Sequence, residues 1–255
     1  MADSFAEFVQ NRRARSNDNQ GSIHKAISGV RYVRLDEDTH GTVGARIGSS
    51  DRNSVQLCAY TKVALLKEEG GRIYFRIIDG PYRDSGTASM KTEDAAHYLR
   101  GTPPTESNET LKVKYGRLGE ENSPFKGRLQ QQWGILKVGG ENVTVTLNSV
   151  WGGRFTPIAP GRHRIMTVDG SHAHISTEGY RNTYPGRIKA NDAWFPIELE
   201  GTKGNSSRYV HIGHLSEGCV TVHDILKWNT VYDFLISHRL PNTNGLYVAY
   251  LEVTK

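Results

Sequence analysis

Cysteine is scarce in this 255-residue chain, which contains Cys58, Cys219 and no other. Two cysteines so far apart do not make a disulfide framework, which excludes the small proteins that several bridges hold together. Cys58 lies in the apolar run "VQLCAYTKVALL", and we expect it to be a buried packing residue. Cys219 lies among glycine and polar residues, so its chemistry needs separate consideration.

Long hydrophobic runs and dense basic runs are also missing. No apolar stretch reaches the length of a membrane-spanning helix, so we expect no transmembrane segment. The N-terminal stretch "MADSFAEFVQNRRARSNDNQ" has no apolar core of the kind found in secretory signals. The sequence also has no zinc-finger spacing, RNA-binding signature or dense Lys/Arg block, so we expect no nucleic-acid partner.

The residues that are present describe an ordinary globular protein. Hydrophobic residues make up 36% of the chain and charged residues 23%, which excludes a disordered protein. Many short apolar runs are bounded by the 27 glycines, and this pattern favours a mainly β protein with few helices. The net charge of +5 lies in residues 111–255, where 17 Lys and Arg face 12 Asp and Glu. Such a surface suits an anionic partner, for example a carboxylate-bearing peptide or a cell-wall polymer.

Changes in composition divide the chain into four segments. Residues 1–27 are polar and predict a flexible lead-in or a short helix, while residues 28–101 alternate like strands and predict a small β-rich module. Within the module, "KEEGG" (67–71) is a hairpin turn signal. Residues 102–110, with two prolines, predict a linker, and residues 111–255 predict a second β-rich domain.

The second domain has a hairpin as its clearest predicted element. "WGILKV" (133–138) and "VTVTLNSV" (143–150) predict two strands joined by a turn. A strand at 111–115 is expected to lead into a loop rich in glycine and charge. Further on, the patterns predict strands at 206–213 and 245–253 and an amphipathic helix at 221–239.

The stretch "HIGHLSEGCVTV" (211–222) gathers the residues with the strongest chemical potential. A cysteine nucleophile needs a base, a lowered thiol pKa and backbone N–H groups aimed at the developing oxyanion. Gly218 permits a sharp turn directly before Cys219, and a turn can bring His211 to face the cysteine. The dipole of the helix expected a few residues later would favour the thiolate.

This stretch resembles the catalytic signature of the L,D-transpeptidases, cysteine enzymes that cross-link bacterial peptidoglycan. That signature has an apolar strand ending in His-x-Gly, a loop, and then Ser-His-Gly-Cys before an apolar residue. Here "YVHIG" (209–213) is followed by "SEGCV" (216–220). Upstream, "FTPIAPGRHRI" (155–165) resembles a second family stretch, Thr-Pro-x-Gly-x-Phe-x-Ile, with an insertion. The similarity covers about residues 130–255 and implies a β-sandwich or barrel, while the N-terminal module loosely resembles bacterial SH3-like domains.

The resemblance implies a role for each matching residue. Cys219 would be the nucleophile and His211 the base, with the amides of Gly218 and Cys219 stabilising the oxyanion. Ser216 matches the signature serine and would orient the base. The second signature histidine has no direct match, and His214 is the candidate to substitute for it. We expect no cofactor and no metal ion.

The sequence departs from the signature at two positions near the cysteine. Glu217 stands where the family has histidine, and Thr221 stands where it commonly has arginine. The loop between the two motifs is short, as in compact variants found in antibacterial effector toxins. These departures leave transpeptidation and hydrolysis both open. We assign substrate binding to Glu217, Thr221, Arg154 and Arg208. Arginine can bind a substrate carboxylate bidentately, and Arg164 is a further candidate for this contact.

The resulting expectation is an enzyme that acts on peptidoglycan stem peptides in the bacterial periplasm or cell wall. Without a recognisable signal, delivery by secretion machinery such as type VI and a matching immunity protein are expected. A non-catalytic wall-binding protein on the same fold is one alternative. The other is a zinc hydrolase, in which the metal ligands would be His211, His214, Cys219 and His223. The histidines of "SHAH" (171–174) belong to an expected loop and are candidates for the mouth of the site.

Overall fold

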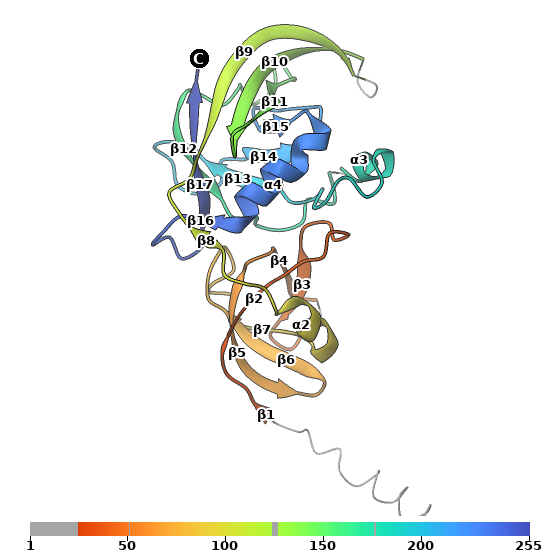
Figure 1. Ribbon diagram of the computed structural model, residues 1–255, viewed down its shortest axis with the longest axis vertical. Coiled ribbons are helices and arrows are strands. Elements are labelled where there is room, and N and C mark those ends of the chain that lie inside the picture. The colour runs from red at the N-terminus through yellow and green to blue at the C-terminus, as the bar shows by residue number, and fades with distance from the viewer. Residues whose placement is uncertain (1–24, 51, 124–126, 176) are drawn as a thin grey trace, which may run out of the picture.

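The computed structural model describes residues 25–255 apart from residues 51, 124–126 and 176. Strands dominate these residues and helices are few, which confirms the expectation of a mainly β protein. Most of the expected lead-in, residues 1–24, lies outside the described residues. The described chain forms two β-structured parts, which Figure 1 shows one above the other. None of its described helices is long and apolar enough to cross a membrane.

The N-terminal part is built on one sheet, with seven strands among the described residues and the order β1-β5-β6-β7-β3-β4, while β2 also pairs with β5. The elements are β1 (Lys25–Ala26), β2 (Val30–Tyr32), β3 (Val43–Ile47), β4 (Ser54–Leu57), β5 (Lys62–Glu69), β6 (Arg72–Ile77), β7 (Thr87–Lys91) and α2 (Thr92–Tyr98). Gly70 and Gly71, with φ of 56° and 71°, form the turn between β5 and β6, which confirms the "KEEGG" hairpin. Because β1 pairs with β5, this sheet begins inside the segment expected to lead in.

The C-terminal part is a closed barrel whose described strands follow the order β10-β11-β15-β14-β13-β12-β17-β9. Its strands are β9 (Thr110–Ser123), β10 (Gly127–Val138), β11 (Glu141–Asn148), β12 (Gly161–Met166), β13 (Phe195–Glu198), β14 (Tyr209–Ile212), β15 (Val220–Val222) and β17 (Tyr247–Thr254). The short helix α3 (Glu178–Thr183) lies in the connection from β12 to β13. Two neighbouring pairs are parallel, β14 with β15 and β17 with β9, and the other neighbours are antiparallel.

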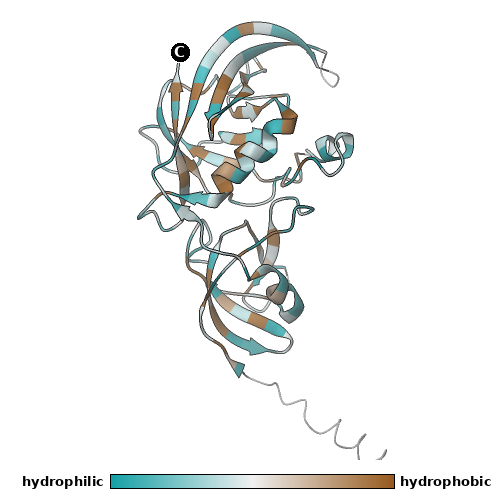
Figure 2. Cartoon of the chain, in the orientation of Figure 1, coloured by the Kyte–Doolittle hydropathy of each residue, from teal (hydrophilic) through white to brown (hydrophobic). Residues whose placement is uncertain are grey.

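Alternating burial explains why these segments form barrel strands. In β9, Leu111 and Val113 are fully buried while Lys112 and Lys114 are exposed. Figure 2 shows the same alternation of hydrophobic and hydrophilic residues along β9 and β10. Apolar residues from all eight strands meet in one continuous core, as expected for a barrel interior filled by side chains.

The hairpin of β9 and β10 is longer than the sequence predicts. The loop expected after residue 115 was wrong, because β9 continues to Ser123 and β10 begins at Gly127. The pairing of β10 with both neighbours shifts register next to Trp133. Beyond this irregularity most side chains are polar or exposed, so the alternation that signals a strand disappears. The expected hairpin of β10 and β11 is confirmed.

The helix predicted at 221–239 is wrong in its first part. Residues 220–222 form β15, and a 3-10 turn (Ile225–Lys227) leads into α4 (Trp228–Ser237). The run Val-Thr-Val suits a strand, and here it closes the barrel between β11 and β14. From Trp228 onward the amphipathic helix is confirmed, with one face buried against the barrel: Trp228, Val231, Tyr232, Leu235 and Ile236.

The segment expected as a linker is tied to the barrel part. Its short strand β8 (Thr105–Glu106) pairs in parallel with β16 (His238–Arg239), which follows α4. The barrel itself begins at Thr110. Residues 102–110 are therefore held in place by β8 and by the start of β9, and they do not form a free linker.

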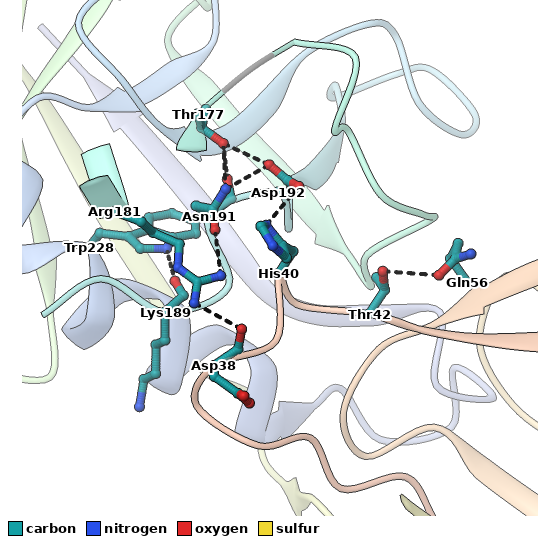
Figure 3. Close-up of polar contacts among 10 residues, drawn as sticks. All are labelled: Asp38, His40, Thr42, Gln56, Thr177, Arg181, Lys189, Asn191, Asp192 and Trp228. Atoms are coloured by element: carbon teal, nitrogen blue, oxygen red, sulfur yellow. Dashed lines mark hydrogen bonds and ion pairs between the residues drawn. The ribbon is translucent and has the colours of Figure 1, made fainter. Parts of the chain in front are cut away.

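A loop of the N-terminal part, residues 36–42, contacts the barrel part (Figure 3). His40 Nδ1 lies 3.3 Å from Asp192 Oδ2, and the Asp192 N–H donates to the His40 carbonyl at 3.1 Å. The backbones approach so closely at Gly41 that an added Cβ would lie 2.7 Å from the Cβ of Ala193. The loop therefore packs directly against the segment that leads into β13.

Candidate active site

The stretch 211–222 contributes to two neighbouring parallel strands, β14 and β15. Their register pairs Val210 with Val220 and His211 with Thr221. Parallel neighbours generally need a connection of a dozen or more residues, yet here residues 213–219 suffice. Each strand is only three or four residues long, so the seven connecting residues, which reach about 23 Å when extended, can run back along the length of one strand. His211 thus lies opposite Thr221, and Cys219 lies one step before β15, at the level of Tyr209.

The candidate residues lie on the outer face of the barrel. The alternate residues of both strands belong to the core and are fully buried: Val210, Ile212, Val220 and Val222. Because neighbouring side chains in a strand point to opposite faces, His211 and Thr221 point outward. Cys219, two residues before Thr221, is directed to that same face.

Cys219 is nearly buried, with 7% of its surface exposed. Burial raises the pKa of its thiol to about 11, while a hydrogen bond from the Tyr209 backbone and the charge of Arg208 act in the opposite direction. The carboxylate of Glu217 adds to the rise in the pKa. At neutral pH the thiol is therefore protonated in this arrangement. The lowered thiol pKa expected from the sequence is wrong for this state, because burial outweighs the favourable contacts.

His211 is equally buried and both ring nitrogens have partners. Nδ1 lies 2.8 Å from the Ile212 carbonyl, and Nε2 lies 3.0 Å from Thr221 Oγ1. A carbonyl can only accept, so Nδ1 carries the proton and Nε2 accepts from the threonine hydroxyl. Burial lowers the pKa of His211 to about 4, so its imidazole is neutral at pH 7. Its lone pair is directed at Thr221.

An aromatic stack covers the His211 ring. The rings of His211 and Trp194 are 4.0 Å apart and inclined by 14°. His172 in turn stacks on Trp194, with centroids 4.7 Å apart. This agrees with the expectation that a histidine of "SHAH" lies near the site, whereas nothing in the sequence marks Trp194. Only the pairing of β13 with β14 brings that tryptophan to His211.

The turn before Cys219 is tightly constrained. Ser216 Oγ donates to the Cys219 carbonyl at 3.0 Å, and the Ser216 backbone exchanges hydrogen bonds with Ser149. Gly218 has a φ of 89°, and a Cβ at this position would lie 2.3 Å from the Thr156 carbonyl oxygen. Ser216 therefore holds the turn, because its hydroxyl is directed at the Cys219 carbonyl and not at the base it was expected to orient. The sharp turn at Gly218 is confirmed.

The expected support of the thiolate by a helix dipole is wrong. Cys219 is followed directly by β15, and α4 begins nine residues after it. The positive charge that lowers the thiol pKa comes instead from a side chain, that of Arg208. Sequence reasoning assigned Arg208 to substrate and missed this relation, because the contact depends on how the turn 213–219 folds back.

The residues expected to bind substrate lie at different depths. Arg154 and Glu217 are exposed, whereas Arg208 is 8% exposed and Thr221 is fully buried. The position of Thr221 beneath the surface, bonded to His211, does not support a substrate contact for it. Arg164 pairs with Glu198 across the neighbouring strands β12 and β13.

His214 lies apart from the cysteine and the base. The His214 ring is 4.6 Å from the ring of His223, whose Nε2 lies 2.8 Å from Glu121 Oε1. The backbone N–H of His214 donates to Tyr180 Oη. The structure thus brings His214 to His223 and not to His211. Nowhere in the described chain do three or more His, Cys, Asp or Glu side chains stand where they could hold a metal ion. The zinc interpretation therefore lacks a set of ligands there.

The site thus consists of Cys219 and His211 on one outward face, with Thr221 bonded to the histidine and Arg208 beside the turn. A cavity of about 390 Å³ lies elsewhere, between the N-terminal sheet and α4, and is lined by neither Cys219 nor His211. Comparison with protein-family models, curated proteins and solved structures finds no match for the chain. The function is therefore argued from the site itself.

Proposed function

We propose that the chain is a peptidoglycan-acting cysteine acyltransferase of the L,D-transpeptidase type, built on an L,D-transpeptidase-like barrel. One observation carries the proposal. The histidine of "HIG" lies on β14 and the cysteine of "SEGC" directly precedes the adjacent parallel strand β15. Both are directed to the same face, in the order that the family signature has. A nucleophile and a base so placed are the minimum for covalent acyl transfer.

The proposed reaction has two steps. The sulfur of Cys219 adds to the carbonyl carbon of an L,D or D-centred peptide bond in a stem peptide, and its proton passes to His211. The tetrahedral intermediate collapses, the C–N bond breaks, and the leaving amine takes that proton. The resulting thioester is then attacked by an acceptor amine or by water, which restores the thiol. The amides of Gly218 and Cys219 are the proposed oxyanion donors.

Two movements would make the resting site competent. His211 and Cys219 are diagonal neighbours across the strand pair, so the imidazole has to turn from Thr221 toward the sulfur. The thiol also has to become accessible, since it is 7% exposed. Glu217, within the turn directly before the cysteine, is exposed, and we propose that it contacts the substrate. We propose that substrate binding supplies both movements.

The test is incubation of the purified chain with muropeptides of defined stem length, followed by mass spectrometry. We expect new cross-linked, exchanged or shortened stems with the wild type and none with Cys219→Ala. Cys58→Ala serves as the matched control, because Cys58 lies in the core and should not affect the products. Identical product profiles for wild type and Cys219→Ala would refute an enzyme that uses this cysteine.

The proposed substrate lies outside the cytoplasmic membrane of bacteria, so we propose the periplasm or cell wall as the place of action. An antibacterial effector with a neutralising immunity protein is consistent with that substrate. Expression in a Gram-negative host tests this: export to the periplasm should slow growth, whereas cytoplasmic expression and exported Cys219→Ala should not. Equal growth in all three cultures would argue against the effector role.

A non-catalytic wall-binding protein is the second candidate, and one observation favours it. The thiol is buried with a pKa raised to about 11, and His211 is bonded to Thr221. Labelling with a thiol reagent at neutral pH, with and without muropeptide, discriminates the two. Acceleration of Cys219 labelling by a non-hydrolysable stem peptide supports the enzyme, whereas binding of sacculi with equally slow labelling supports the binding protein.

A further inference from the structure

Arg208 is a buried cation beside the cysteine turn. With 8% of its surface exposed, its guanidinium donates to the carbonyls of Glu217 at 3.3 Å and Thr156 at 3.1 Å. It lies over the ring of Phe155, with Cζ 4.3 Å from the ring centroid. These neutral partners fix the position of the guanidinium, but none of them neutralises its charge.

The charge of Arg208 has no acidic partner in the described part of the chain. No ion pair among the described residues includes it, and its Nε is buried without a hydrogen-bond partner. Arg164 shows the contrast, since its guanidinium is paired with Glu198. Burying an unpaired charge is costly, so a guanidinium in this state is poised for an anion that forms nearby.

The anion that can form next to Arg208 is the thiolate of Cys219. A Cβ added to Gly218 would lie 2.7 Å from Cζ of Arg208, so the guanidinium rests against the residue directly before the cysteine. The charge of Arg208 lowers the pKa of Cys219, and the titratable groups around the thiol are otherwise Glu217, which raises it, and Tyr209, whose backbone N–H reaches the sulfur.

His211 is not available to supply this charge in the resting state. Both of its nitrogens are engaged, and Nε2 is directed at Thr221 rather than at the cysteine. The ring stacks on Trp194 in a buried position that disfavours its protonated form. An ion pair between thiolate and imidazolium would need the ring to leave this position first.

We propose that Arg208 is the positioning residue that stabilises the Cys219 thiolate electrostatically, a charge that the neutral His211 of the resting site does not supply. When His211 turns from Thr221, its Nε2 takes the thiol proton, and Arg208 stabilises the negative charge that remains on the sulfur. This inference rests on the proposed function only in taking Cys219 as the nucleophile. Arg208 acts through the cysteine sulfur, so its effect is measurable without any peptidoglycan substrate.

The experiment measures the rate at which iodoacetamide alkylates Cys219 in the full chain, from about pH 6 to about pH 9.5, with peptide mapping to separate Cys219 from Cys58. Each unit by which a thiol pKa rises lowers the thiolate population tenfold and raises its nucleophilicity about threefold. The net slowing is therefore about threefold per unit. In the wild type we expect a steady rise with pH and no plateau near neutrality.

We expect Arg208→Met to slow alkylation at least about threefold and Arg208→Lys, which keeps the charge, to stay within about twofold of wild type. Arg154→Met is the matched control, because Arg154 packs on the same Phe155 ring, at 5.1 Å, but is exposed. Equal rates for Arg208→Met and wild type, or equal slowing by Met and Lys, would overturn the proposal. A plateau in the wild-type rate near neutral pH that His211→Gln abolishes would also overturn the proposal, because the charge would then come from His211.

A second measurement needs no variant and covers the case in which Arg208→Met fails to fold. The ratio of the rates with anionic iodoacetate and neutral iodoacetamide cancels the thiolate population. A cation beside the sulfur should raise this ratio for Cys219 above that of free cysteine in the same buffer. A ratio at or below the free value contradicts the proposal. A raised rate ratio for Cys219 in a protein that forms no muropeptide products would instead refute only the proposed function.

Discussion

The hydroxyl of Thr221 lies 3.0 Å from Nε2 of His211, across the parallel pair of β14 and β15. This contact fixes the tautomer of the histidine, because the other nitrogen faces the Ile212 carbonyl. The L,D-transpeptidase signature that the stretch resembles commonly has arginine at this position, where this chain has threonine. We interpret Thr221 as the residue that keeps Nε2 unprotonated in the resting state, so that this nitrogen can accept the thiol proton once the ring turns to the sulfur.

Replacing Thr221 with valine should disturb the base while keeping the shape of the side chain. The variant leaves Nε2 of the buried histidine without its donor, which should cost about 1–3 kcal/mol of stability. We expect turnover of muropeptides to fall at least about tenfold, as part of the 10²–10⁴ that a general base contributes. Thr221→Ser keeps the hydroxyl and should retain most activity. Wild-type turnover by Thr221→Val would show that this bond is not needed to keep Nε2 unprotonated.

Gly218→Ala should destabilise the protein by a steric mechanism. The added Cβ would lie 2.3 Å from the Thr156 carbonyl oxygen, in addition to the strain of a φ of 89°. Gly140→Ala is the matched control, because its φ of 86° is similar and no atom lies within 4 Å of the added Cβ. We expect Gly140→Ala to cost about 1–2 kcal/mol and Gly218→Ala about 1–3 kcal/mol more. Equal losses in chemical denaturation would mean that the turn can move aside.

Acid should destabilise the native state through His211. Its folded pKa, lowered to about 4, lies below the ordinary value of 6.5. Between these values the unfolded chain binds a proton that the native state refuses, so stability falls as pH decreases from about 6.5 to about 4. The full effect is about 3 kcal/mol.

His211→Gln removes this titration, so the contribution of His211 is the difference between two denaturation series. Asp79, whose pKa burial raises to about 6, titrates in both proteins and cancels in the difference. We expect the gap between wild type and His211→Gln to change by about 3 kcal/mol across this pH window. A gap that stays constant would show that His211 titrates normally in the folded protein.

Local patterns in the sequence predicted the elements whose residues alternate over a sufficient length. The turn at Gly70 and Gly71 and the amphipathic face of α4 are examples, as is the buried position of Cys58. Each follows from neighbours in the sequence, through a turn that needs positive φ or a regular spacing of apolar residues.

The relations within the site could not be predicted in the same way. β15 has three residues, too few to distinguish a strand from the start of a helix. Trp194 meets His211 through the pairing of β13 with β14, and Arg208 meets the cysteine turn because residues 213–219 fold back. Such contacts depend on how the barrel closes, which a pattern in one segment does not determine.

The docking of the N-terminal part should also influence the candidate base. Gly41 has a φ of 107° and packs against the barrel part, where an added Cβ would lie 2.7 Å from Ala193. Ala193 directly precedes Trp194, which covers the His211 ring. We expect Gly41→Ala to displace this segment, loosen the stack and let the pKa of His211 rise toward its ordinary range.

The pKa follows from the pH titration of the His211 ring proton by NMR, and the melting temperature reports the loss of docking. Gly48→Ala is the control within the N-terminal part, because its φ of 64° carries similar strain but no atom lies within 4 Å of the new Cβ. If Gly41→Ala and Gly48→Ala leave His211 with the same pKa, the N-terminal part does not support the site. A higher pKa in Gly41→Ala alone would connect the two parts through Ala193 and Trp194, because relief of burial is what raises the pKa of a buried histidine.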